Sequence, residues 1–247
     1  MFYRLISGFS SVLLSGAITL QSSALAQSAP TTQFRDITGD IYVNEIEQAV
    51  ELGIVAGFED QTFRPQAPVT REQLVSMVLR AMVQVPLENR SQNINPTLPA
   101  IPTQTTTNPF SDVDKTRWSA TQIQYLKDLG IIRGYPDGTF QPTQTVTRAE
   151  LIVMLKTVER YLVKLRGNWD GRRTFTQPVP LNFSDIQNHW AKDTIMEMSG
   201  NCHTGQVATF LNEMGTQFAP DTAAQRNYAA AAIVREVRCL SVPAISS

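Results

Sequence analysis

The sequence predicts an all-α fold made of three related helix–loop–helix repeats. The prediction rests on a motif that occurs three times, on capping signals at the start of helix-length segments, and on one apolar face along those segments. The chain has 247 residues, of which 42% are hydrophobic, so a packed core is within its reach. One repeat cannot bury its apolar face alone, so we expect the three to pack around shared helices.

Residues 1–26 have the pattern of an export signal. Arg4 precedes an uncharged, apolar stretch from Leu5 to Leu20, and residues 24–26 give the small-x-small pattern that signal peptidase recognises. The apolar stretch has about 16 residues, which is short for a membrane-spanning helix. We therefore interpret residues 1–26 as a cleaved signal peptide; an uncleaved anchor is the alternative.

Each repeat opens with the motif Phe-x-Asp-Ile or Phe-x-Asp-Val, which begins at Phe34, Phe110 and Phe183. An aromatic residue follows at a near-constant spacing and precedes the predicted first helix. These aromatic residues are Tyr42, Trp118 and Trp190.

A loop joins the two helices of each repeat. In the first two repeats a Leu-Gly-Ile motif leads into this loop, which ends in Thr-Phe-x-Pro. We expect Gly57, Gly134 and Gly138 to supply positive φ angles there. The third repeat keeps Phe-Ala-Pro at residues 218–220, but residues 201–205 and a longer insertion replace its glycine-rich loop.

Capping signals predict where the second helices begin. Thr70-x-x-Gln73 and Thr147-x-x-Glu150 are capping boxes, in which each end of the motif bonds the backbone amide of the other. In the third repeat, Thr222-x-x-Gln225 is an alternative box that would start the helix one turn early. The apolar faces that follow are Leu74, Met77, Val78, Ala81 and Met82; Leu151, Met154, Leu155, Val158, Leu162 and Leu165; and Ala229, Ala232, Ile233, Val237 and Leu240.

These motifs resemble those of the S-layer homology (SLH) family, and they occur in the family's order, most closely in the second repeat. The resemblance implies a pseudo-threefold helical prism of three repeats. It also implies binding of acidic, often pyruvylated, cell-wall polysaccharide in grooves between repeats. The expected organisation is a signal peptide (1–26), repeat 1 (27–84), a Pro/Thr-rich linker (85–109), repeat 2 (110–166), a second linker (167–182), a degenerate repeat 3 (183–241) and a tail (242–247).

Arginine recurs at the start of the second helix in every repeat. A cation there opposes the helix dipole by about 0.3–1 kcal/mol, so we expect Arg71 and Arg148 to serve binding rather than stability. Free backbone amides at the start of a helix, together with an arginine, would donate hydrogen bonds to a bound carboxylate or phosphate. The alternative is that each arginine bridges to Asp60 or Asp137 and locks the loop. With the resemblance, the candidate glycan-binding residues are Asp60, Thr70, Arg71, Trp118, Asp137, Thr147, Arg148, Glu150, Trp190 and Arg226.

Two details of this site remain open in the sequence. Trp118 and Trp190 would stack on sugar rings, or would instead belong to the core. The degenerate loop makes the groove that contains Arg226 the weakest of the three. In the same repeat, Cys202 and Cys239 would pair in an oxidising compartment, with two buried thiols as the alternative.

Charge and composition limit the function classes. The 21 basic and 22 acidic side chains give a formal net charge of −1, which argues against nucleic-acid binding. We find no catalytic constellation, metal site or cofactor motif, so we expect a non-catalytic protein exported to the cell envelope. The resemblance implies peptidoglycan-linked secondary cell-wall polysaccharide as its partner; another envelope protein, bound through the same surface, is the alternative.

Overall fold

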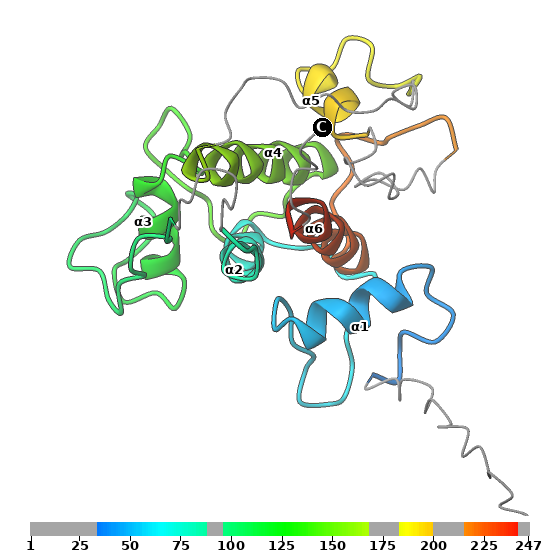
Figure 1. Ribbon diagram of the computed structural model, residues 1–247, viewed down its shortest axis with the longest axis horizontal. Coiled ribbons are helices and arrows are strands. Elements are labelled where there is room, and N and C mark those ends of the chain that lie inside the picture. The colour runs from blue at the N-terminus through cyan, green and yellow to red at the C-terminus, as the bar shows by residue number, and fades with distance from the viewer. Residues whose placement is uncertain (1–33, 88–95, 168–182, 200–214, 242–247) are drawn as a thin grey trace, which may run out of the picture. The chain divides into compact units, whose positions relative to one another are not determined.

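The computed structural model describes residues 34–87, 96–167, 183–199 and 215–241 (Figure 1). These residues form helices and isolated bridges but no strand, which confirms the predicted all-α fold. No helix among them is both long and apolar enough to cross a membrane. The proposed signal peptide lies outside the described residues. The helices are α1 (Val43–Glu51), α2 (Arg71–Met82), α3 (Ala120–Asp128), α4 (Arg148–Leu165), α5 (Lys192–Met198) and α6 (Arg226–Ser241).

The long helices begin where the capping signals place them. At α2, the backbone amide of Gln73 donates to Thr70 Oγ1 over 3.4 Å. The backbone amide of Thr70 donates back to the side-chain oxygen Oε1 of Gln73 over 3.0 Å. The Thr147–Glu150 box at α4 is formed in the same way. Helix α6 begins at Arg226, so the alternative start at Thr222 is wrong. The third repeat thus aligns with the other two through its arginine.

The three long helices lie at the centre and each contacts the other two (Figure 1). Each short helix packs on a long helix of a neighbouring repeat: α1 on α6, α3 on α2 and α5 on α4. Among the described helices, none of the short ones contacts the long helix of its own repeat. The contacts are therefore cyclic and link every repeat to the other two. The prism geometry that the resemblance implies stays a prediction.

A charged contact accompanies each pairing of a short and a long helix. Arg235 of α6 pairs with Glu45 of α1, and both side chains are buried. Lys156 Nζ of α4 lies 2.6 Å from Glu197 Oε1 of α5. Glu72 of α2 pairs with Arg117, which precedes α3, over 2.7 Å. Only the Arg235–Glu45 pair is buried on both sides, and removing one of its members would leave the other uncompensated, so this pair favours one arrangement of α1 and α6.

A closed ring of backbone hydrogen bonds joins the residues that precede the long helices. The amide of Val69 donates to the carbonyl of Ala224 over 3.0 Å. The amide of Ala224 donates to the carbonyl of Val146, and the amide of Val146 donates to the carbonyl of Val69, each over 2.9 Å. Each residue thus gives one bond and receives one bond from a different repeat. All three side chains are fully buried. The starts of the three long helices are therefore fixed together.

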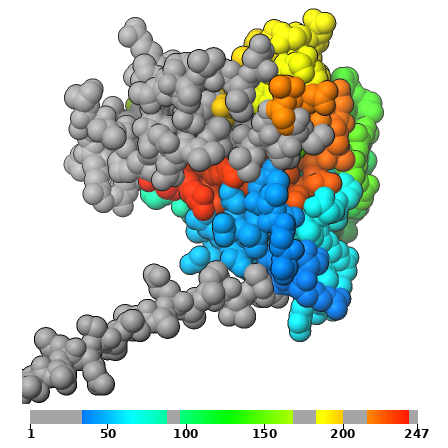
Figure 2. All heavy atoms as spheres, turned by 90° about the vertical axis from the view of Figure 1, so that its right-hand side faces the viewer, coloured from blue at the N-terminus to red at the C-terminus, as the bar shows by residue number. Residues whose placement is uncertain are grey.

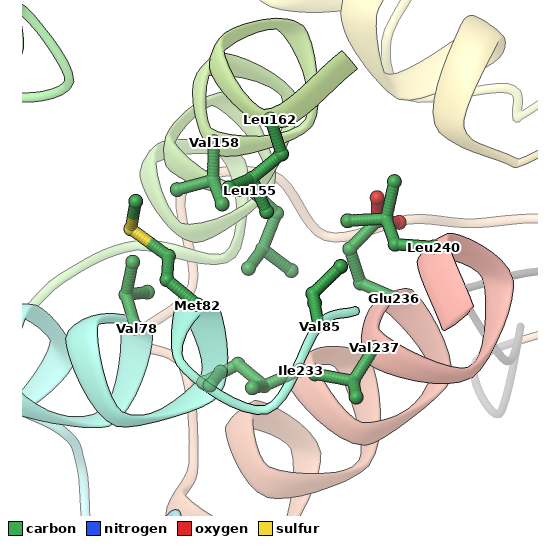
Figure 3. A pocket seen from close by; sticks show the side chains of 11 residues that line it. Val78, Met82, Val85, Leu155, Val158, Leu162, Ile233, Glu236, Val237 and Leu240 are labelled. Atoms are coloured by element: carbon green, nitrogen blue, oxygen red, sulfur yellow. The ribbon is translucent and has the colours of Figure 1, made fainter. Parts of the chain in front are cut away.

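The other ends of the long helices meet in an apolar pocket (Figure 3). Its lining comes from the C-terminal halves of α2, α4 and α6, together with Val85 just beyond α2. The hydrogen-bond ring and this pocket therefore mark opposite ends of one three-helix core. The residues around the pocket include Val78, Met82, Leu155, Val158, Leu162, Ile233, Glu236, Val237 and Leu240.

Gly57 and Gly134 do not serve the role expected from the sequence. Neither has a positive φ angle, whereas Gly138 does, at 81°. A Cβ atom on Gly57 would lie 1.9 Å from the ring of Phe34, and one on Gly134 would lie 2.5 Å from the ring of Phe110. These glycines are therefore required by the close approach of a phenylalanine ring.

Substituting Gly134 with alanine should destabilise the fold, because the new methyl group would meet Phe110 and, at 2.6 Å, the backbone oxygen of Thr139. Overpacking of this kind costs about 1–3 kcal/mol. Urea unfolding followed by circular dichroism measures the loss. Lys115→Ala, at an exposed loop position, is the control and should change stability by less than about 0.5 kcal/mol. Equal stability of the two variants would show that Gly134 is not required by packing.

Candidate functional site: the junctions between repeats

Each long helix begins against the loop of another repeat, and we call these contacts the junctions. The first–second junction contains Arg71, the second–third junction contains Arg148, and the third–first junction contains Arg226. At the first of them, the amide of Arg71 donates to Gln144 over 2.9 Å and the amide of Glu72 donates to Pro142 over 3.0 Å. At the second–third junction, the amides of Arg148 and Ala149 donate to the carbonyls of Thr222 and Pro220. At the third–first junction, the amides of Arg226 and Asn227 donate to the carbonyls of Ala67 and Pro65.

The arginine side chains strengthen the same contacts. Arg71 Nε donates to the carbonyl of Phe140 over 2.8 Å, and Arg148 Nε donates to that of Phe218 over 2.8 Å. Arg226 Nε donates to Phe63 over 3.0 Å. Each of these phenylalanines is fully buried in the next repeat along the cycle. The arginine therefore holds the loop of its neighbour.

An aspartate of the opening motif holds each of these phenylalanines from the other side. The carboxylate of Asp112 accepts hydrogen bonds from the backbone amides of Phe140 and Gln141, each with a nitrogen–oxygen distance of 2.7 Å. Asp36 and Asp185 make the equivalent pairs of bonds. The residue after the phenylalanine has a positive φ angle in each case, which turns its amide toward the carboxylate; these residues are Arg64, Gln141 and Ala219, with φ of 60°, 57° and 54°.

The expectation of free helix amides is therefore wrong. The first two amides of each long helix bond the next repeat, and in α2 and α4 the third amide bonds the capping threonine. Arg71 and Arg148 are only 8% and 7% exposed. Their first role is structural, which the conflict with the helix dipole did not predict. A contact with a ligand would use only the outer edges of these guanidinium groups.

Acidic groups surround the arginines of the first–second junction. Glu150 Oε1 lies 3.6 Å from Arg71 Nη1. Glu72 accepts hydrogen bonds from Arg117 over 2.7–2.8 Å and from the Ser119 hydroxyl over 2.6 Å. Burial alone would raise the pKa of Glu72, but the bonds from Arg117 and Ser119 outweigh burial and lower it. The carboxylate is therefore held ionised against Arg117.

All three junctions place aromatic rings against the arginine. Arg71 Cζ lies 4.8 Å from the ring centre of Tyr135 and 4.7 Å from that of Phe140. Arg148 Cζ lies 3.8 Å from the ring centre of Tyr228. Arg226 Cζ lies 4.8 Å from the ring centre of Phe63 and 5.2 Å from that of Phe58, and its Nη2 donates to the carbonyl of Ala56 over 2.6 Å. Burial, with repulsion from Arg64 as a second cause, lowers the pKa of Arg226.

Asp60 and Asp137 shape their loops. Asp60 Oδ1 accepts the amide and the hydroxyl of Thr62 over 3.2 and 2.6 Å, and Asp137 Oδ1 accepts those of Thr139 over 2.9 and 2.7 Å. In both cases the threonine hydroxyl is the main reason that the aspartate pKa is lowered. Asp60 also pairs with Arg64 over 3.3 Å. These contacts fix the loops beside the junctions.

Trp118 and Trp190 are 58% and 66% exposed, so their assignment to the core is wrong. Both directly precede the N-cap residues of short helices, which are Ser119 and Ala191. In the first repeat the N-cap residue is Tyr42, which is buried. The structural equivalent of the tryptophans is therefore Ile41, which is 64% exposed, and the aromatic spacing pointed to the wrong neighbour.

Trp118 adjoins the first–second junction, because it lies between Arg117 and Ser119, which both donate hydrogen bonds to Glu72. Trp190 packs on His189, with ring centres 5.4 Å apart, and His189 lies 3.2 Å from Asp221 in the loop of the second–third junction. Two junctions therefore have an exposed tryptophan beside them. Within the described residues, no group of three or more His, Cys, Asp and Glu side chains could hold a metal ion.

The predicted disulfide involves a residue outside the described part of the chain. Cys239 lies in α6 and is 9% exposed, whereas Cys202 belongs to residues 200–214. The pairing stays a prediction.

Replacing Arg71 with alanine should destabilise the protein, because it removes the bond to Phe140 and leaves that buried carbonyl without its donor. A loss of about 1–3 kcal/mol is expected, measured by urea unfolding. Arg71→Lys should recover little of it, because an ammonium group lacks the guanidinium geometry. Arg80→Ala removes an exposed arginine from the same helix and serves as the control. Unchanged stability of Arg71→Ala would contradict the structural role.

Comparison with known proteins identifies two of the repeats. The family model described as S-layer homology domain matches residues 33–75 and 109–152. Each matched segment covers the opening motif, the short helix, the loop and the start of the long helix. The third repeat has the same pattern of backbone bonds, but its assignment to the family stays a prediction.

The relatives are much longer proteins. Cell surface glycoprotein 1 of Acetivibrio thermocellus is 30% identical over 153 residues, which is 62% of this chain and 6% of the relative. The cellulosome-anchoring protein of the same organism is 35% identical over 86 residues, or 35% of this chain and 17% of the relative. The surface layer protein of Brevibacillus choshinensis is 29% identical over 163 residues, or 64% and 13%.

The chain thus spans between 6% and 17% of the length of these relatives. Their names agree with the predicted location at the cell envelope. Residues 33–75 and 109–152 of the chain thus match the S-layer homology domain family.

Proposed function

We propose that this protein binds cell-wall polysaccharide, without catalysing a reaction on it, along the junctions between its repeats. The observation that carries the proposal is the exposure of Trp118 and Trp190 at equivalent positions beside two junctions. Large aromatic side chains are normally buried, and repeated exposure at one place in a fold marks a binding surface. The flat face of an indole suits the apolar face of a sugar ring.

The junctions beside these tryptophans are held rigid. The phenylalanine of each loop is bonded by an aspartate on one side and by an arginine on the other, so the loop backbone has little freedom. A rigid surface loses less entropy when it binds a polymer than a mobile one does. In this proposal Asp60, Asp137, Thr70 and Thr147 keep the loops and helix starts in place. Trp118, Trp190 and the outer edges of Arg71, Arg148 and Arg226 would contact the sugar, while Glu150 would orient Arg71.

The ligand that we propose is the peptidoglycan-linked secondary polysaccharide of the wall, recognised through carboxylate-bearing sugars, of which pyruvylated sugars are one class. Guanidinium groups favour carboxylates because two parallel hydrogen bonds form between them. The names of the relatives, among them a middle cell wall protein of Brevibacillus brevis, support a ligand in the wall. Export by residues 1–26 and a Cys202–Cys239 disulfide belong to the same proposal.

The alternative partner is another envelope protein. One relative is named a cellulosome-anchoring protein, which describes an association with a protein assembly. The two partners predict different behaviour toward purified wall sacculi. A polysaccharide ligand is lost when the secondary polymer is stripped chemically, whereas a protein ligand is absent from purified sacculi from the outset.

Trp118→Ala and Trp190→Ala should each weaken binding to purified sacculi, measured by co-sedimentation. Loss of a stacking contact of about 0.5–1.5 kcal/mol corresponds to roughly two- to tenfold in affinity. Trp118→Phe keeps an aromatic face and should retain most of the binding. Ile101→Ala truncates another exposed apolar side chain and should bind as the wild type does.

Stripping the secondary polysaccharide from the sacculi should abolish binding of the wild type. Retained binding to stripped sacculi, or wild-type affinity in both tryptophan variants, would count against the proposed ligand. Thermal unfolding of each variant controls for folding, since the two tryptophans are exposed and their loss should leave the core intact.

A further inference from the structure

The linker between the first two repeats ends in an uncharged segment, residues 96–109, which we call the strap. Proline fixes φ and has no amide to donate, so the four prolines of the strap oppose a helix. Pro96, Pro99 and Pro102 recur at every third residue, which is the repeat of an extended polyproline II helix. The structure accordingly has neither helix nor bridge between residues 96 and 109.

Helix α3 holds the strap near both of its ends. The hydroxyl of Tyr125 donates to the carbonyl of Pro99 over 2.7 Å, and Lys127 Nζ donates to the carbonyl of Pro109 over 2.6 Å. Leu98 also packs against the hydrophobic core. Between these anchors lie the residues that we call the threonine run: Thr103, Thr105, Thr106 and Thr107.

The threonine run is open to solvent, and its backbone is not bonded into the fold. Thr103, Thr106 and Thr107 are exposed, and Thr105 is half-buried. None of residues 97–108 makes a backbone–backbone hydrogen bond to another described residue. Within the run, the Thr105 hydroxyl donates to the carbonyl of Thr107 over 3.0 Å, which is a local contact. The run could therefore enter the groove of an enzyme without breaking a contact between repeats.

A second copy of part of this sequence lies elsewhere in the chain. The tetrapeptide Pro-Thr-Gln-Thr occurs at residues 102–105 in the strap and again at residues 142–145 in the second repeat. Thr143 and Thr145 are exposed, as Thr103 is. Sequence and exposure are thus shared by the two copies, and only the bonding of the backbone distinguishes them.

Residues 142–145 belong to the first–second junction. The carbonyls of Pro142 and Gln144 accept hydrogen bonds from the backbone amides of Glu72 and Arg71 over 3.0 and 2.9 Å. Junction loops are packed in this way between repeats; Figure 2 shows the first repeat (blue and cyan) lying against the orange atoms of the third. Moving such a loop into an enzyme would open a junction, whereas moving the threonine run would not.

We propose that the threonine run is an O-glycosylation site of the exported protein. Threonine-rich sequences that contain proline are typical of O-glycosylated segments. A threonine Oγ1 attacks the anomeric carbon of a glycosyl diphosphate, the bond from that carbon to the phosphate oxygen breaks, and the diphosphate leaves. The hydroxyl proton passes to a base of the separate transferase. This proposal goes beyond the proposed function, because the strap carries sugar and the junctions bind it.

The strap and the residues just before it offer no acceptor for N-linked sugar. Residues 95–97 are Asn-Pro-Thr, and proline in the middle position excludes N-glycosylation. Asn108 is followed by Pro109 and Phe110, and its Oδ1 accepts the backbone amide of Lys115 over 3.0 Å. Sugar on the strap is therefore attached to a hydroxyl group.

The test compares the protein purified from the envelope of its native cells with the same mature chain made in a cell-free system, which adds no sugar. Trypsin should release residues 91–115, which include the strap, and residues 134–148, which include the second tetrapeptide. In the native protein, peptide 91–115 should be heavier by whole sugar residues, and fragmentation should place them on the threonine run. Peptide 134–148 should have the mass of its sequence in both preparations.

A combined variant provides the second measurement. Replacing all four residues of the threonine run with alanine, in protein made by the native cells, should abolish the mass gain of peptide 91–115. The fold should persist, because these side chains are outside the core. Thr143→Ala combined with Thr145→Ala is the matched control, since it removes the threonines of the other tetrapeptide, and it should keep the full mass gain.

Two results would overturn the site. A native peptide 91–115 with the mass of its sequence, or with sugar only outside the threonine run, would refute it directly. Sugar on both copies of the tetrapeptide would show that exposure alone selects the acceptor, which contradicts the role of the unbonded backbone. Either result leaves the binding of sacculi untouched, because that binding is tested at the tryptophans beside the junctions.

Discussion

The structure depends on one peptide group that is held from both sides in every repeat. The amide of the loop phenylalanine donates to an aspartate of its own repeat, and its carbonyl accepts from an arginine of another. Because the arginine comes from the preceding repeat in the cycle, no repeat completes its own loop. The ring formed by Val69, Ala224 and Val146 closes the same cycle at the backbone level. Each repeat is therefore stable only when it is packed against the other two.

This arrangement changes what the recurring arginine means. At the start of a helix, a cation conflicts with the helix dipole by only about 0.3–1 kcal/mol, while an unsatisfied buried carbonyl costs about 1–3 kcal/mol. Because the cost of the orphaned carbonyl exceeds that of the dipole conflict, the fold requires Arg71 and Arg148 whether or not a ligand binds. In the proposed function, ligand preference would depend on the positions that vary around this pair of bonds. Those positions are the third helical residue, the loop residue with positive φ, and the exposed residue before each short helix.

Much of the fold could be predicted from the sequence, because it is encoded locally. The Thr70–Gln73 and Thr147–Glu150 boxes mark the helix starts, and the apolar spacing marks the buried faces. The site was harder to predict because its contacts join residues far apart: Arg71 and Phe140 are separated by 69 positions. Local spacing also favoured Tyr42 over Ile41 as the equivalent of the tryptophans. The signal that could have revealed the interlocking of the repeats is the joint recurrence of aspartate, phenylalanine and arginine in all three.

The third repeat shows which features the cycle requires and which it does not. The residue directly before Arg226 is Gln225 and not a threonine, yet α6 still begins at that arginine, and its first two amides bond Ala67 and Pro65 of the first repeat. Helices α2 and α4 have the same two bonds, so the missing threonine is replaced within α6, where Asn227 Oδ1 accepts a hydrogen bond from the Tyr228 amide over 2.7 Å. The third repeat diverges at the capping threonine, and it keeps Asp185, Phe218 and Arg226, which bond the loops of the cycle. A degenerate motif in one repeat is therefore compatible with a fully formed junction.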